Sequence, residues 1–184
     1  PCNMEGGIVN GTWYVPETSR IMLRDKGYTR HGRKIACNSE SLFEPIDMSI
    51  YVEDSGRKKI SHVAYNIPEV RGLLEEHADS WFLIITWILP AEPYLSVVMI
   101  LRRRQLERAC TPADRILSEF IHGTDVFRKE RFKFIPRVER CSPILRKGIT
   151  LLGGERPTLI CRKIANKFFR GDNYLELDIN ISSS

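Results

Sequence analysis

The segment WFLIITWILPAEPYLSVVMIL, from Trp81 to Leu101, is the strongest structural signal in the chain. Its 21 residues match the length of a membrane-crossing helix. However, Pro90, Glu92 and Pro93 interrupt its middle, where a charge between two prolines would be costly. Both halves are rich in aromatic and β-branched residues. The segment therefore predicts a buried β-hairpin with PAEP as its four-residue loop, in preference to a transmembrane helix.

A helix is expected over residues 112–122, directly after this hairpin. Thr111 is a favourable N-cap, Pro112 fits the first helical position, and Asp114 lies beside the positive end of the helix dipole. Gly123 is suited to end the helix. One apolar stripe follows from the spacing of Ile116, Leu117, Phe120 and Ile121.

The end of the chain, RGDNYLELDINISSS, predicts the second strand of another hairpin, over residues 174–181. Its partner is expected within 158–169, with RGDN as the turn; a turn is favoured over an integrin-binding role for the Arg-Gly-Asp tripeptide. Strict alternation places an aliphatic row toward the core, formed by Leu175, Leu177, Ile179 and Ile181. The polar row is expected to face solvent or a following segment, and comprises Tyr174, Glu176, Asp178 and Asn180.

The remaining elements are less sharply marked. Strand regions are expected at 13–24, at 41–51 with an interruption at Pro45, and at 132–138, and a short helix is expected at 69–78. Together these patterns predict an α+β fold, in which a curved, mainly antiparallel sheet carries the helix 112–122.

Length and composition suit one domain over residues 1–184, and the first residue, Pro1, suggests a fragment of a longer protein. The net charge of +5 permits attraction to anionic membranes or nucleic acid but does not demand either. Five scattered cysteines without a CxxC pair favour reduced thiols in a cytosolic compartment over disulfides or a zinc site.

No catalytic motif stands out. The chain has no GxSxG sequence and no histidine pair at metal-ligand spacing. Glu176 and Asp178 share one strand face and could serve as an acid–base pair, but the solvated face of an edge strand is the favoured interpretation. Arg102-Arg103-Arg104, and the basic residues interleaved with phenylalanines from Phe127 to Arg140, suit lipid headgroups or RNA phosphates. An ordinary solvated face explains these clusters equally well.

Two C-terminal segments carry a family resemblance: HGTDVFRKERFKFIPRV at 122–138 and LLGGERPTLICRKIANKFFRGDNYLELDINISSS at 151–184. They resemble the C-terminal domain of the plant Enhanced Disease Resistance 2 family, and the resemblance covers most of the chain, being weakest from about Asp54 to Ser80. The residues of this chain that carry the family motif include Phe127, Arg128, Phe132, Pro136, Gly171, Asn173, Tyr174, Glu176 and Asp178. Family domains continue beyond the equivalent of Ser184, so a truncated domain is expected.

The resemblance implies a cytoplasmic, peripherally membrane-associated domain, often placed after pleckstrin-homology and START domains of the same longer protein. It implies no agreed enzymatic activity, catalytic residue, metal or cofactor. We therefore expect a non-catalytic lipid-binding or membrane-associating module that does not bind nucleic acid, with an apolar groove and a basic headgroup surface. The alternatives are a module that binds an acylated or amphipathic peptide and, below it, a lipid-acting enzyme. Candidate groove and headgroup residues are Trp81, Trp87, Phe120, Arg102, Arg103, Arg131 and Lys133.

Overall fold

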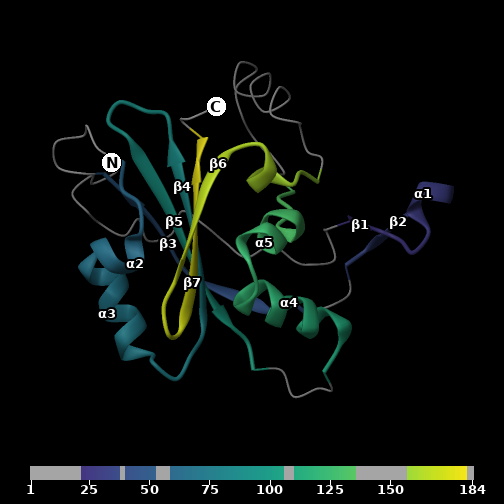
Figure 1. The fold of residues 1–184 in the computed structure, drawn as a ribbon, viewed down its shortest axis with the longest axis horizontal. Coiled ribbons are helices and arrows are strands. Elements are labelled where there is room, and N and C mark those ends of the chain that lie inside the picture. The colour runs from purple at the N-terminus through teal and green to yellow at the C-terminus, as the bar shows by residue number, and fades with distance from the viewer. Residues whose placement is uncertain (1–21, 38–39, 53–58, 106–109, 136–156, 182–184) are drawn as a thin grey trace.

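A computed structural model describes residues 22–37, 40–52, 59–105, 110–135 and 157–181 of the chain (Figure 1). Its centre is a five-stranded sheet with the strand order β3-β5-β4-β7-β6. Only the β4–β7 pair is parallel, so the expected mainly antiparallel α+β fold is confirmed. The strands are β3 (Phe43–Tyr51), β4 (Phe82–Leu89), β5 (Leu95–Arg103), β6 (Ala165–Arg170) and β7 (Tyr174–Asn180).

The central apolar segment forms the expected hairpin, because β4 and β5 pair antiparallel from Phe82 opposite Arg102 to Leu89 opposite Leu95. The prolines lie in the connection, where they cost no ladder hydrogen bond. None of the helices in the described ranges has the length and apolarity needed to cross a bilayer.

Helices cover both faces of the sheet, as Figure 1 shows. On one face, α2 (Val63–Asn66) and α3 (Pro68–Glu76) bury Val63, Val70 and Leu74 against Phe82 and Ile84. The other face carries α4 (Pro112–His122), α5 (Asp125–Arg131) and the short 3₁₀ helix η2 (Ile160–Arg162). Its core contains Ile85, Leu177 and Ile179.

The predicted helix 112–122 is present with the expected ends. Thr111 accepts a hydrogen bond from the Asp114 amide, and the Asp114 carboxylate accepts from the Thr111 amide at 2.7 Å, which forms a capping box. The C-cap is Gly123, where an added Cβ would lie 2.4 Å from the Glu119 carbonyl oxygen. The predicted helix 69–78 is also present, as α3.

Three strand predictions need correction. The region 41–51 is not interrupted at Pro45: β3 continues through it, and the register shifts between Pro45 and Asp47. The strand expected at 132–138 is wrong over the described residues, since only an isolated bridge joins Phe134 to Thr158 and the rest lies outside the described part. The strand expected at 158–169 begins only at Ala165, because η2 occupies the preceding turn.

The C-terminal hairpin is confirmed, with Gly171, Asp172 and Asn173 connecting β6 to β7. Gly171 is required there, because a Cβ would lie 2.1 Å from the Tyr174 ring. At the other end of the described chain, β1 (Met22–Arg24) and β2 (Lys34–Ala36) form a separate two-stranded sheet around α1 (Tyr28–His31). Most of the strand region predicted at 13–24 lies outside the described residues.

Candidate functional site

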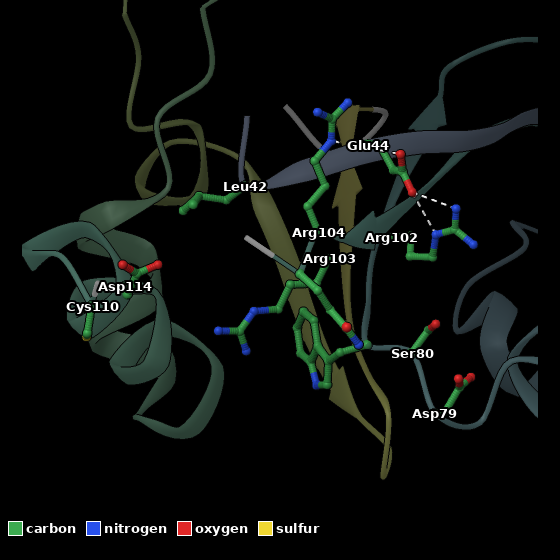
Figure 2. Close-up of a pocket in the computed structure, with 11 residues that line it drawn as sticks. Leu42, Glu44, Asp79, Ser80, Arg102, Arg103, Arg104, Cys110 and Asp114 are labelled. Carbon is green, nitrogen blue, oxygen red and sulfur yellow. Dashed lines mark hydrogen bonds and ion pairs between the residues drawn. The ribbon is translucent and has the colours of Figure 1, made fainter. Parts of the chain in front are cut away.

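A pocket of about 960 Å³ opens where β5 ends, between the start of β4, the start of β3 and the N-terminal end of α4 (Figure 2). It brings together three segments that are far apart in the sequence, because β5 is flanked by β3 and β4 in the sheet. The lining residues are Leu42, Glu44, Asp79, Ser80, Trp81, Arg102, Arg103, Arg104, Gln105, Cys110 and Asp114.

Three of the predicted candidate residues meet in this pocket: Trp81, Arg102 and Arg103. The Trp81 ring packs against Phe43 with a centroid distance of 6.2 Å, which fixes one wall. Arg102 and Arg103 belong to the last two positions of β5, so their side chains leave the strand on opposite faces. Sequence reasoning could place both arginines near the hairpin end, but not beside α4.

Glu44 holds two of the arginines in place. It lies directly opposite Arg102 in the β3–β5 register. One oxygen of its carboxylate accepts from the Arg102 Nε at 2.7 Å and lies 2.6 Å from the Arg102 Nη2. The Arg104 Nε lies 3.8 Å from the same carboxylate. Cross-strand pairs of opposite charge stabilise neighbouring strands. Sequence reasoning missed Glu44, since only the strand register reveals this partner.

Arg103 differs from its two neighbours. Figure 2 shows it extending to the side of α4, whereas Arg102 and Arg104 turn toward Glu44. Among the described residues, the structure gives Arg103 no ion pair, and its side chain is exposed. The pocket also contains Asp114, which is engaged in the α4 capping box, and the exposed Asp79. The three arginines of the pocket are thus matched by three carboxylates in formal charge. Because Arg103 alone among these arginines has no carboxylate partner in the described residues, it is the cation best able to bind an incoming anion.

The other candidate residues lie elsewhere. Trp87 and Phe120 belong to the packed layer between the sheet and α4–α5, with Trp87 4.6 Å from the Phe134 ring and Phe120 6.4 Å from the Phe132 ring, centroid to centroid. Arg131 is exposed on α5 over the Phe127 ring, and Lys133 is exposed just beyond that helix. The structure does not bring these four residues to the pocket.

Arg128, from the family motif, is a structural residue. It is only 6% exposed, and its guanidinium donates to the carbonyl oxygens of Phe120 and Ile121, both at 2.8 Å. It also contacts Asp125 at 2.6 Å and lies over the Phe168 ring. These bonds satisfy the last carbonyls of α4 and bind it to α5. Pro136, another motif residue, lies outside the described part.

The polar row of β7 contradicts the expectation of a solvated face. Glu176 is 0% exposed and Asp178 is 2% exposed. The Glu176 carboxylate accepts from the amides of Val63 and Ala64 at 2.6 and 3.1 Å. Asp178 accepts from the Ser61 hydroxyl and, at 2.9 Å, from the His62 amide. The reason is topological: β7 is a central strand rather than an edge strand, and α2 sits on this face.

The two carboxyls share one buried environment, which raises the proton affinity of Glu176. Burial, and secondarily the nearby Asp178 carboxylate, raise the pKa of Glu176 to about 8. Asp178 Oδ1 has no hydrogen-bond partner among the described residues, and a proton on Glu176 can supply one. Neither carboxyl lines the pocket. Their bonds to α2 favour a structural role over acid–base catalysis.

The rest of this motif supports the same corner of the molecule. The Asn173 side chain donates to the Leu74 carbonyl oxygen at 2.9 Å, and the Tyr174 hydroxyl lies 3.3 Å from the His62 ring nitrogen. His62 stacks on Phe169 at a 4.1 Å centroid distance, and burial lowers the pKa of its imidazole while Asp178 opposes that shift. The motif thus joins the C-terminal hairpin to α2 and α3.

Residues 13–184 match the family described as "Protein ENHANCED DISEASE RESISTANCE 2, C-terminal". The chain belongs to this family. Among curated proteins, an Arabidopsis thaliana "Protein ENHANCED DISEASE RESISTANCE 2-like" is 25% identical over 175 residues, which cover 94% of this chain. The chain spans about a fifth (22%) of that relative's length. No solved structure matches the chain.

Within this member of the Enhanced Disease Resistance 2 C-terminal family, metal binding finds no support in the described residues. No group of three or more His, Cys, Asp and Glu side chains is placed there to hold an ion.

Proposed function

We propose that this domain is a non-catalytic lipid-binding or membrane-associating module that recognises an anionic headgroup in the pocket beside Arg103. The observation that carries the proposal is the position of Arg103: an exposed side chain that lines a pocket of about 960 Å³, without an ion pair among the described residues. Guanidinium groups bind phosphate oxygens through two parallel hydrogen bonds, which gives both affinity and orientation.

The surrounding residues support a headgroup more than an acyl chain. Eight of the eleven lining residues are polar or charged, and the apolar ones are Leu42, Trp81 and Cys110. Trp81 offers an indole N–H donor and an aromatic wall, a combination enriched where lipid headgroups meet the acyl region. The predicted apolar groove around Trp87 and Phe120 is filled by packed aromatic side chains in the described residues.

Native mass spectrometry of the purified domain, followed by lipid extraction, tests the proposal. One phospholipid per chain in the wild type, lost in Arg103→Glu, is the expected result. Lys163→Glu serves as a charge-matched control, because Lys163 is exposed and does not line the pocket. A wild-type protein without lipid, even after incubation with phosphatidylserine, contradicts the proposal and favours a module that binds an acylated or amphipathic peptide.

Cys110 gives a second readout, since its exposed thiol lies in the pocket wall. A headgroup bound beside Arg103 should slow alkylation of Cys110 severalfold, measured peptide by peptide. Cys161 is the internal reference, because burial raises the pKa of its thiol to about 11 and keeps it unreactive with or without lipid. Equal Cys110 alkylation rates with and without lipid would place the ligand outside this pocket.

A further inference from the structure

A small module, residues 22–36, extends away from the sheet and its helices and is called here the basic ribbon (Figure 1). It consists of β1, α1 and β2, and the two strands pair from Met22 opposite Ala36 to Arg24 opposite Lys34. An isolated two-stranded ribbon is marginally stable in water, so an exposed one gains from a surface to lie on.

The basic ribbon carries five cationic side chains and a single carboxylate, Asp25, which gives it a formal charge of +4. Asp25 is paired with Arg33: its carboxylate accepts from the Arg33 Nε at 3.0 Å and from the Arg33 Nη2 at 2.9 Å. The Arg24 guanidinium lies 4.7 Å from the centre of the Tyr28 ring. The cations are Arg24, Lys26, Arg30, Arg33 and Lys34.

Two of these cations face each other across the strands. Arg24 and Lys34 are direct partners in the antiparallel register, so their side chains leave the same face of the basic ribbon. Like charges in directly opposite positions destabilise a strand pair. Since the structure gives Lys34 no carboxylate partner among the described residues, an external anion would remove this repulsion.

The opposite face is apolar and open. Leu23 and Ile35 are also direct partners, and they are 40% and 48% exposed. Met22, the first residue of β1, is 51% exposed but lies on the same face as Arg24. Two exposed aliphatic side chains that face each other on a ribbon with five cations match the chemistry of a membrane interface.

Nucleic acid is the other polyanion to weigh. Single strands are held by stacking of bases on exposed aromatic rings, and the only aromatic ring of the described ribbon residues, besides the His31 imidazole, is Tyr28. Arg24 lies over that ring. Exposed aliphatic groups gain nothing from a phosphate backbone, whereas they gain free energy in the acyl boundary of a bilayer.

We propose that the basic ribbon is a membrane-docking element, which inserts Leu23 and Ile35 into an anionic bilayer surface. The long side chains of Arg24 and Lys34 leave the other face and bend around the edges of this narrow two-stranded ribbon to bind lipid phosphates and carboxylates. Long basic side chains can reach headgroups while their stems lie along apolar surface. This surface is separate from the pocket beside Arg103, and it does not require that the pocket be occupied.

Co-sedimentation with vesicles tests the proposal, using phosphatidylcholine alone and a three-to-one mixture of phosphatidylcholine and phosphatidylserine. Binding to the mixed vesicles is expected, and Lys34→Glu should weaken it by about tenfold or more, since each Lys or Arg near such a surface contributes about a factor of five. The same substitution places opposite charges across the strands. The variant should therefore not weaken the strand pair, and unchanged hydrogen exchange of the Leu23 and Ile35 amides checks this.

Ile35→Thr tests the apolar contribution separately, because it keeps a β-branched residue in the strand while removing exposed aliphatic surface. It should reduce vesicle binding at high salt, where the electrostatic contribution is screened. Lys163→Glu, which changes charge equally at η2, should retain at least half of the wild-type affinity. Equal loss in Lys163→Glu and Lys34→Glu would overturn the proposal, as it would show attraction by net charge alone.

The two proposals fail in distinguishable ways. If Lys34→Glu binds mixed vesicles like the wild type, the basic ribbon does not dock, whatever native mass spectrometry finds in the pocket. If Lys34→Glu loses vesicle binding but the purified wild type carries no lipid, docking stands and the pocket proposal fails. Binding of the wild type to single-stranded RNA, with none to mixed vesicles, overturns membrane docking.

Discussion

Arg128 shows how a residue in a basic cluster can belong to the interior. Its guanidinium is committed to two helix-ending carbonyl oxygens and to Asp125, so it presents almost no charge to solvent. The interleaving of basic and aromatic residues from 127 to 133 therefore combines an internal arginine with the exposed Arg131 and Lys133. Sequence alone does not separate these roles.

Replacing Arg128 with lysine should lower the free energy of unfolding by about 2 kcal/mol or more. A lysine has no planar fork to donate to Phe120, Ile121 and Asp125 together, so at least one buried carbonyl oxygen loses its partner. Chemical denaturation followed by circular dichroism measures the change. Arg131→Lys is the matched control on the same helix and should shift stability by less than about 0.5 kcal/mol.

Glu176 makes the stability of the fold decrease as the pH rises. Its folded-state pKa, about 8, is raised above its ordinary value of 4.5. The folded state therefore holds the proton more tightly than the unfolded chain does. This contribution to stability is fully present below about pH 4.5 and is lost as pH rises toward 8.

Glu176→Gln should remove that dependence, because the amide imitates the protonated acid. Between about pH 5 and about pH 8 the wild type should lose stability relative to the variant, by up to about 1.4 kcal/mol per pH unit. Denaturation curves at several pH values measure the difference. A constant difference across this range would show that Glu176 is ionised in the folded protein, and the exposed Glu130→Gln variant controls for general charge effects.

At the scale of elements, α2 depends on strand β7 for the bonds that begin it. His62, its N-cap, has a left-handed backbone with φ of 53° and gives no side-chain cap. The carboxyls of β7 accept the amides of His62, Val63 and Ala64 instead. A four-residue helix without its own cap is held by its neighbour's side chains, which explains why acidic residues occupy a central strand.

The hairpin 81–101 and helix 112–122 were predictable because their signals are local: prolines at the turn, and a cap with an apolar stripe. The burial of Glu176 and Asp178 was not, because alternation along β7 is the same whether its polar face meets water or α2. One available signal was the spacing of Val63, Ile67, Val70 and Leu74, which predicts an apolar helical face in need of a sheet surface.

The α4 capping box should contribute about 1 kcal/mol to the free energy of unfolding. Thr111→Ala removes the hydroxyl that donates to Asp114 at 2.6 Å and accepts from its amide at 3.4 Å. The thermal midpoint should fall by a few degrees, as differential scanning calorimetry can measure. Ser118→Ala, an exposed substitution within the same helix, should leave the midpoint nearly unchanged or raise it slightly, because alanine favours helices.

At the scale of the whole molecule, stability should decrease from the central strands to the basic ribbon. β4 and β7 are paired on both sides and covered on both faces, whereas β1 and β2 pair only with each other among the described strands. Hydrogen exchange should therefore show the amides of Leu175, Leu177 and Ile179 opening only on global unfolding. Amides of Leu23 and Ile35 should exchange at least a hundredfold faster.

The pocket is a property of the whole molecule, which limits what the sequence could reveal about it. Arg102 and Arg103 were identified from the run of three arginines after the hairpin, but their separate roles follow from the β3–β5 register and from the position of α4. Trp87 and Phe120 are aromatic like Trp81, but the topology places them in the packed layer between the sheet and α4–α5. Tertiary arrangement decides which aromatic residue meets the arginines.

The parallel pairing of β4 with β7 has a consequence for synthesis of the chain on the ribosome. The partner of Phe82–Leu89 is Tyr174–Asn180, about ninety residues later. Until those residues emerge, the edge of β4 opposite β5 has no strand beside it, and the amides of His62, Val63 and Ala64 lack their carboxyl acceptors. The nascent protein must therefore wait for β7 to complete this sheet, and during that interval chaperones have a defined, aggregation-prone edge to protect.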